Sequence, residues 1–129
     1  MERLRNEHGD DFDAIMIFPG TNDFNAGVPI GEWFTEEKVT VNADGNMVER
    51  KRRVLSFDMG TFRGRLNTAL DILKRMYPSK QIVLLTPIHR AYAKFSEKNV
   101  QPDESHCNSC GEYVDAYVES IKEASGISP

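Results

Sequence analysis

Polar residues that can stabilise a developing negative charge follow the first apolar run of the sequence. Residues 14–18 are all apolar, and the segment Pro19–Asp23 that follows them contains Gly20 and Asn22. A glycine leaves its backbone N–H accessible, and an asparagine side chain beside it supplies a second donor. Two converging N–H donors are what an oxyanion hole needs when an acyl carbonyl becomes tetrahedral. The same residue types also form plain turns, so composition alone leaves both interpretations open.

A second group of reactive side chains lies near the carboxyl end of the sequence. The segment Asp103–His106 places a carboxylate three residues before an imidazole, as an orienting acid and a general base require. Cys107 and Cys110 follow as a Cys-x-x-Cys pair in front of an expected helix, where thiolates are favoured. Such a pair can serve redox chemistry or form half of a zinc site, but no second pair occurs in the sequence.

Two strands and a helix are expected to position the first group. The run Ala14–Phe18 is typical of a strand buried on both faces, and a second buried strand is expected at Gln81–Thr86. Between them, Thr61–Tyr77 repeats apolar residues at helical spacing, with Thr61 able to cap its start. This order predicts a right-handed unit with parallel strands. Their carboxyl ends then share one edge, which is where open α/β sheets bind ligands.

Further elements are expected outside that unit. Asp44-Gly45 between short β-prone runs predicts a β-hairpin insertion around residues 38–50. A second helix is expected at Gly111–Ala124, preceded by Ser109-x-x-Glu112 in the form of a capping box. Residues 93–102 are polar and predict no strand. Because two parallel strands cannot cover the apolar faces of their helices, we expect the sheet to be incomplete in this chain.

Length and charge exclude several classes of protein. The 129 residues fit one domain, and the net charge of −4 argues against a nucleic-acid partner. The basic run Arg50–Arg53 is therefore interpreted as a solvated strand edge. No apolar run approaches the ~20 residues of a membrane span. The N-terminus does not resemble a signal peptide. Because we expect an N-terminal part to be missing, as argued below, a cytoplasmic and a secreted location of the intact protein both stay open.

A family resemblance gives these patterns a more specific meaning. The segment Asp13–Phe24 resembles the Gly-x-Asn-Asp block of the SGNH hydrolases, the GDSL-type lipases and esterases. Residues 62–77 and 81–90 resemble the helix and strand that follow it in bacterial acylhydrolases, so the similarity covers roughly residues 12–125. The resemblance implies a three-layer α/β/α sandwich with a flavodoxin-like parallel sheet. It also implies hydrolysis of carboxylic esters, such as acylated sugars or lipids, by a serine nucleophile without a metal or other cofactor.

The Gly-x-Asn-Asp block assigns roles to five neighbouring residues. By resemblance, Asn22 is the oxyanion donor, Gly20 lets the loop pass close to the substrate, and Asp23 braces the loop by hydrogen bonds. Thr21 and Phe24 are expected to contact the substrate.

Two pairs of residues farther along the chain complete the expected site. His89 and Arg90 follow the second strand at the same sheet edge, where they contact substrate or are simple surface residues. Asp103 and His106 match the family's Asp-x-x-His block of base and orienting acid. In the alternative alignment, which we favour, the real block lies beyond residue 129 and His106 is a solvated loop histidine.

The sequence also departs from the family. The Gly-Asp-Ser block, which carries the nucleophile, occurs nowhere in the 129 residues, and the block with the second oxyanion donor is absent too. We therefore expect a chain that lacks an N-terminal part and is inactive alone. An alternative of another class is a non-catalytic α/β module that binds a partner or forms a homo-oligomer through its open sheet edge.

Overall fold

The protein has a mixed α/β fold built from small two-stranded sheets. The computed structural model describes residues 11–127. Their elements are β1 (Ala14–Ile17), α2 (Thr21–Asn25), β2 (Phe34–Ala43), β3 (Asn46–Leu55), α3 (Phe62–Met76), β4 (Gln81–Leu84), β5 (Ala93–Ser96), β6 (Asn99–Gln101) and α4 (Val114–Ile127). β1 pairs with β4, β2 with β3, and β5 with β6.

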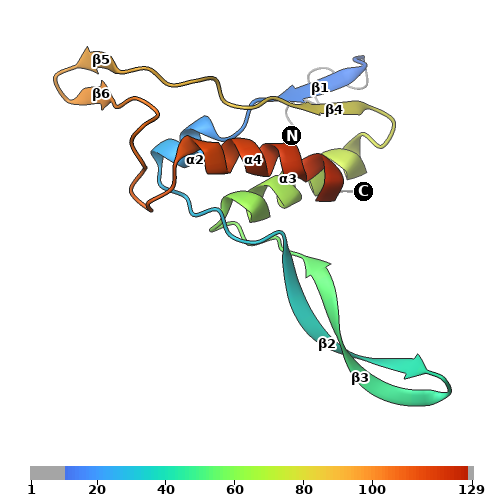
Figure 1. The fold of residues 1–129 in the computed structure, drawn as a ribbon. Coiled ribbons are helices and arrows are strands. Elements are labelled where there is room, and N and C mark those ends of the chain that lie inside the picture. Colours follow the sequence, from blue (N-terminus) through green and yellow to red (C-terminus); the bar gives the residue numbers. More distant parts are fainter. Residues whose placement is uncertain (1–10, 128–129) are drawn as a thin grey trace.

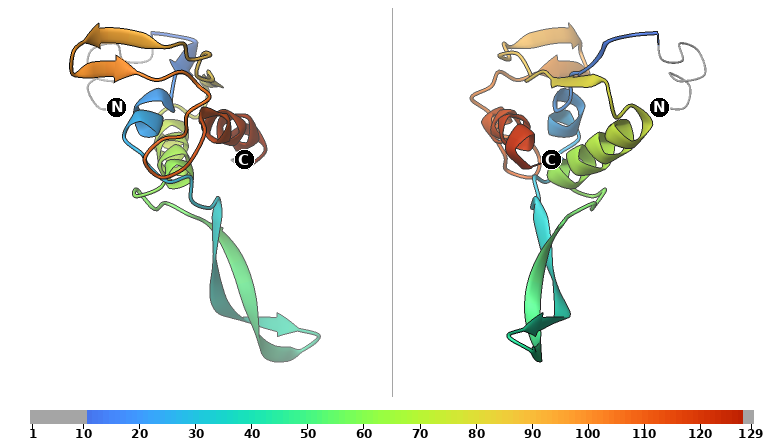
Figure 2. Two further views of the ribbon diagram at one scale, coloured as in Figure 1. Left: turned by 60° about the vertical axis from the view of Figure 1, so that its left-hand side comes forward. Right: turned by 90° about the vertical axis from the view of Figure 1, so that its right-hand side faces the viewer.

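The predicted parallel unit is present. β1 and β4 run parallel, with Ala14 beside Gln81, and the helices α2, α3 and α4 lie on one side of the pair (Figures 1 and 2). The expectation that the first strand is buried on both faces is wrong within the described residues, because Met16 is 67% exposed. Successive side chains of a strand point to opposite faces, so helices on one side cover only every second residue.

The core lies between the helices and the covered face of the strand pair. Thr61 caps α3 as predicted, since its side chain accepts a hydrogen bond from the Gly64 N–H. The Phe62 and Tyr117 rings, from α3 and α4, pack with centroids 5.0 Å apart. The buried core comprises Phe24, Val28, Trp33, Phe62, Leu66, Leu70, Val114, Tyr117, Ile121 and Ala124.

The start of α4 differs from the predicted capping box. The helix begins at Val114, and within residues 11–127 the Ser109 side chain makes no capping hydrogen bond. Instead, the Asn108 side-chain oxygen accepts hydrogen bonds from the N–H groups of Cys110 and Glu112. An asparagine that bonds the backbone two and four residues ahead forms a turn of its own, so the chain enters the helix later than expected.

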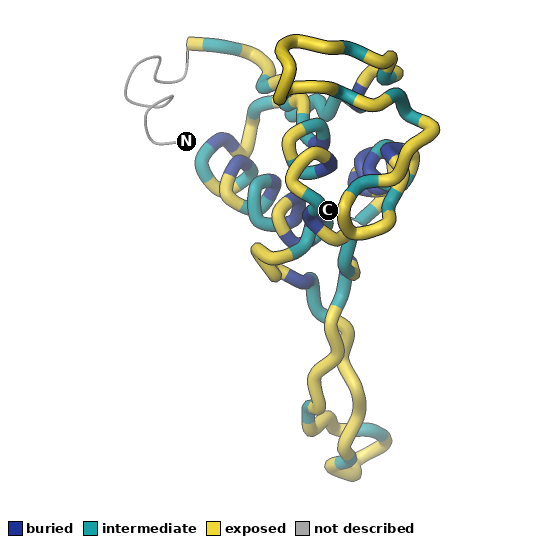
Figure 3. Tube along the Cα trace, turned by 90° about the vertical axis from the view of Figure 1, so that its left-hand side faces the viewer, coloured by how far each residue is buried: buried dark blue, intermediate teal, exposed yellow. Residues whose placement is uncertain are grey.

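The β2–β3 hairpin is longer than predicted. It spans residues 34–55 and projects from the body of the protein (Figures 1 and 3), and we call these residues the arm. Its turn has positive φ at Asp44 (53°) and Gly45 (86°), as a tight hairpin turn requires. Toward the body, Glu36 and Glu37 stand across from Arg53 and Arg52, which favours pairing there, although Lys38 stands across from Lys51.

A third hairpin occupies a segment for which no strand was expected. β5 and β6 pair within residues 93–101, with a register shift between Lys94 and Ser96. The polar composition concealed these short strands, whose apolar members Phe95 and Val100 are themselves exposed. Among residues 11–127, no helix is both long and apolar enough to cross a membrane.

Candidate functional site

The predicted glycine turn stands at the carboxyl end of β1. Gly20 has a φ of 108°, outside the range that residues with a side chain normally adopt. A Cβ atom added there would lie 3.1 Å from Pro87 Cγ and 3.4 Å from Ile121 Cδ1. Gly20 is therefore needed both for its backbone conformation and because the end of β4 and helix α4 approach it closely.

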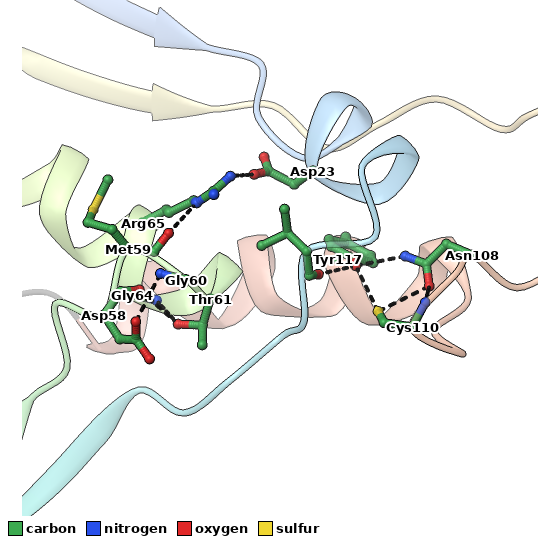
Figure 4. A network of polar contacts seen from close by, with 11 residues as sticks. Asp23, Asp58, Met59, Gly60, Thr61, Gly64, Arg65, Asn108, Cys110 and Tyr117 are labelled. Atoms are coloured by element: carbon green, nitrogen blue, oxygen red, sulfur yellow. Dashed lines mark hydrogen bonds and ion pairs between the residues drawn. The ribbon is translucent and has the colours of Figure 1, made fainter.

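The residues after Gly20 form the short helix α2, which fixes some side chains and leaves others open. Asp23 accepts a 2.9 Å hydrogen bond from Arg65 Nη1, and the Arg65 Nε donates to the Met59 carbonyl (Figure 4). Phe24 is buried in the core. Asn22 is exposed, and its amide makes no hydrogen bond to another residue of the described range. The brace predicted for Asp23 thus exists, and Asn22 is free to donate to a ligand.

A pocket of about 450 Å³ opens beside the end of α2. Its wall is formed by the end of α2, Arg90, the β5–β6 hairpin and the loop of residues 102–109. Of the predicted site residues, the structure brings Phe24, Arg90, Asp103 and His106 together around this pocket. Asn22 does not line it, although its helical neighbour three residues on, Asn25, does.

Asp103 and His106 lie in contact on the pocket wall. Asp103 Oδ1 is 3.2 Å from His106 Nδ1, which leaves Nε2 without a partner among residues 11–127. Ser105 Oγ donates to Asp103 and lies 3.4 Å from the same Nδ1. These three residues do not form a catalytic triad, because serine and aspartate must then meet opposite nitrogens of the imidazole. Hydrogen bonds from Ser105, aided by His106, hold the pKa of the Asp103 carboxyl below its usual value.

His89 and Arg90 follow β4 in the loop of residues 85–92 rather than at the end of the strand itself, and they face different partners. His89 Nδ1 is 3.0 Å from Glu104 Oε2, and its side chain is 96% exposed. The contact with His89 and a hydrogen bond from the Arg90 N–H lower the pKa of Glu104. The Arg90 guanidinium lies 4.8 Å above the Phe24 ring and donates a 2.8 Å hydrogen bond to Asn25. Arg90 therefore borders the pocket, whereas His89 does not line it.

The two cysteines surround a structural asparagine. Cys107 and Cys110 are free thiols, and among residues 11–127 no group of three His, Cys, Asp or Glu side chains could hold a metal ion. Between them, Asn108 Nδ2 donates to the Phe24 carbonyl. The same group donates to Tyr117 Oη (Figure 4). The segment thus ties α2 to α4. Burial is the main cause that raises the pKa of the Tyr117 phenol to about 12.

Sequence reasoning missed the partners that hold the site together. Arg65, Glu104 and Asn108 each bond a residue far away in the sequence or across a loop. A Cys-Asn-Ser-Cys-Gly segment indicates a turn at Asn108, but nothing in the sequence identifies the residues that bond its side chain. The basic run Arg50–Arg53 lies in β3 of the arm, where Arg52 pairs with Glu37, in agreement with a solvated strand edge.

Comparisons with known proteins show the fold but no family. No family model and no curated protein matches the chain. A solved crystal structure is similar over 95% of this chain, with a TM-score of 0.65 and 24% sequence identity. The chain spans 45% of the length of that structure's chain. This likeness supports the α/β arrangement alone.

Proposed function

We propose that this chain is part of a carboxylic ester hydrolase of the SGNH type, in which Asn22 donates a hydrogen bond to the oxyanion. The observation that carries the proposal is the glycine turn at the carboxyl end of β1. There the side-chain amide of Asn22 is exposed and has no hydrogen-bond partner among residues 11–127. It stands between Gly20, whose φ is 108°, and Asp23, which Arg65 holds. A donor that has no partner and stands on a braced backbone segment is suited to a charge that appears only during the reaction.

The rigidity of the turn has identifiable causes. The Arg65 guanidinium holds Asp23 from α3, and the Phe24 N–H donates to the Gly20 carbonyl at 2.8 Å. The Phe24 ring is fixed edge-on against Tyr117, at 5.7 Å between centroids. Preorganised donors stabilise a transition state because they need no rearrangement as charge develops. Asn22 is therefore carried on a segment whose neighbours on both sides cannot easily move.

His106 and Asp103 supply a candidate base for the same proposal. Asp103 holds Nδ1 of the imidazole, and Nε2 is the nitrogen that takes a proton from a serine in such enzymes. The alternative remains a base outside residues 1–129. In both versions of the proposal, the nucleophile is a serine of a Gly-Asp-Ser block outside residues 1–129. Further strands outside these residues then extend the β1–β4 pair into the sheet of a three-layer sandwich.

The pocket is consistent with an ester that has a polar and an apolar part. Phe24, Phe95 and Val100 contribute apolar surface, while Arg90 and Gln101 contribute hydrogen-bond donors. Such a mixture suits the acylated sugars and lipids that the resemblance implies. The proposed reaction involves no metal or cofactor.

The test replaces Asn22 in the full-length protein that contains this sequence. With a p-nitrophenyl ester as substrate, Asn22→Ala is expected to lower kcat by about 10²–10³-fold, as the loss of one oxyanion donor does. Asn25→Ala is the matched control, because Asn25 is also exposed on α2 but lines the pocket. We expect it to change KM more than kcat. An effect of Asn22→Ala on KM alone, or equal effects of both variants, contradicts the assigned role.

A fluorophosphonate probe locates the nucleophile. The 129-residue chain is expected to gain no probe mass, whereas the full-length protein is expected to be labelled at its Gly-Asp-Ser serine. Labelling of the shorter chain would place the nucleophile among its own serines and contradict the assignment to a block outside it.

A further inference from the structure

Arg90 is a half-buried cation that no carboxylate neutralises among residues 11–127. The other half-buried arginine of that range, Arg63, lies 3.5 Å from Glu123 Oε2. Arg90 instead bonds an uncharged amide, that of Asn25, on the wall of the pocket beside α2. Withdrawing a charged group from water costs free energy unless a counter-charge faces it. A cation left in this state on a pocket wall indicates an anionic ligand.

Two acidic side chains of the neighbouring loop are engaged with other groups. Glu104 accepts a hydrogen bond from the Arg90 backbone N–H at 3.3 Å, and its carboxylate lies 3.0 Å from His89 Nδ1. Asp103 accepts hydrogen bonds from the backbone N–H and the hydroxyl of Ser105. Within the described part of the chain, neither carboxylate forms an ion pair with the Arg90 guanidinium. Its counter-charge must therefore come from outside these residues.

The contacts of the guanidinium leave one of its edges open. Its Cζ lies 4.8 Å from the centroid of the Phe24 ring, and Nη2 donates a 2.8 Å hydrogen bond to Asn25 Oδ1. Nε is enclosed and has no hydrogen-bond partner in residues 11–127, whereas Nη1 is not enclosed. Because a guanidinium has five N–H donors, both donors of Nη1 and one of Nη2 remain. Two adjacent donors in one plane match the two oxygens of a carboxylate.

We propose that the pocket binds the free carboxylate of an anionic ester, held by Nη1 and Nη2 of Arg90. Phe24 supports the plane of the guanidinium and Asn25 fixes its rotation, so the open edge is already oriented for the ligand. The exposed side chains of Phe95 and Val100 stand on the same wall, where they contact the apolar part of the ligand. The inference rests on the proposed function, because it names the class of ester that is hydrolysed.

The charges of the pocket favour a carboxylate over a phosphate. At pH 8, the charged residues that line it within residues 11–127 are Arg90 and Asp103, which carry single charges of opposite sign. A phosphate monoester brings about two negative charges toward Asp103. A carboxylate brings one, which Arg90 balances alone. We therefore expect the singly charged ligand to bind more tightly.

The first experiment compares ligands that share one framework and differ in charge. The probes are para-acetamidobenzoate, which is an anion, the neutral para-acetamidobenzamide, and para-acetamidophenyl phosphate, which is mostly a dianion at pH 8. None of them contains a carboxylic ester, so binding is measured without reaction, by ligand-observed NMR with the full-length protein. We expect the benzoate to bind in about the millimolar range, and the benzamide about tenfold more weakly or less. Equal binding of benzoate and benzamide, or tighter binding of the phosphate, overturns the proposal.

Three variants assign the preference for the benzoate to one guanidinium. Arg90→Gln removes the charge and should abolish the preference. Asn25→Asp places a carboxylate where the amide already bonds Nη2, so the protein then supplies the counter-charge itself. This variant should also abolish the preference, and its near-identical shape keeps the test valid if Arg90→Gln unfolds. Arg75→Gln removes a 78% exposed arginine that pairs with Asp71 on α3, and should leave the preference unchanged. A wild-type preference in Asn25→Asp, or its loss in Arg75→Gln, overturns the proposal.

Kinetics separate this inference from the proposed function. The substrates are para-acetoxybenzoate and the neutral para-acetoxybenzamide, whose acetyl esters are released as phenols. We expect the full-length protein to prefer the benzoate by about tenfold or more in kcat/KM, and Arg90→Gln to lose this preference. If both esters are hydrolysed equally well, the substrate class is wrong and the proposed function stands. If neither ester is hydrolysed while benzoate binding still depends on Arg90, the proposed function is wrong and the carboxylate site stands.

Discussion

Different interactions stabilise the body of the protein and the arm. In the body, α3 and α4 bury large side chains, with Phe62 1% and Tyr117 0% exposed. In the arm, which the structure describes throughout, no residue is buried, and order comes from backbone pairing, a tight turn and charges across the ladder. The difference implies that tertiary packing stabilises the body, whereas backbone pairing and the turn stabilise the arm. Equivalent substitutions should therefore change the free energy of unfolding by unequal amounts in the two regions.

The largest expected difference is between two large-to-small substitutions. Phe62→Ala removes a ring that packs against Tyr117 at 5.0 Å and should lower the free energy of unfolding by about 3–5 kcal/mol. Val48→Ala trims an arm residue at which no core forms, and its cost should stay below about 1 kcal/mol. Urea denaturation of each variant measures the two losses of free energy of unfolding. Similar losses for the two variants would mean that the arm is packed like the body.

A smaller contrast compares two glycines with positive φ. At Gly45 (86°), alanine meets no atom within 4 Å, so only the backbone cost of about 1–2 kcal/mol is expected. At Gly20 (108°), the added Cβ also lies 3.1 Å from Pro87 Cγ, and crowding of this kind adds about 1–3 kcal/mol. Denaturation of Gly20→Ala and Gly45→Ala gives the two values. Equal costs for the two variants would show that the neighbours of Gly20 add no crowding.

The sequence predicted the features that local rules determine. Helix α3, its Thr61 cap, the parallel strands and the Asp44-Gly45 turn all follow from periodicity, capping or turn chemistry, and the structure shows them. The length of the arm was not predicted, because its charged residues resemble a loop until their partners across the ladder are known. β5 and β6 were missed because strands of four and three residues carry too little pattern to detect.

The site was predictable only where its residues are close in sequence. The contact between Asp103 and His106 follows from their spacing, and the Gly20–Asp23 turn follows an apolar strand as expected. The bond between Arg65 and Asp23 spans 42 residues, and the pocket joins α2 to a hairpin that was not predicted. An apolar run also does not reveal which of its faces will be covered, which explains the error about β1.

The smallest effect is expected in the loop of residues 102–109, where the partly exposed Asp103 and Glu104 both accept hydrogen bonds. The folded pKa of Glu104 is below its ordinary 4.5, mainly through the contact with His89, and that of Asp103 is below 3.8, mainly through Ser105. A lowered folded pKa stabilises the protein above the unfolded value, and this stabilisation is lost as the pH falls through the folded pKa. NMR titration of the carboxyl carbons should therefore show midpoints below 4.5 for Glu104 and below 3.8 for Asp103.

Because both groups are at the surface, Glu104→Gln should change the melting temperature only slightly at pH 6 and not at all at pH 2. Midpoints at or above the ordinary values would show that these side-chain hydrogen bonds do not persist in solution, and that the loop of residues 102–109 is held by other contacts, such as those of Asn108.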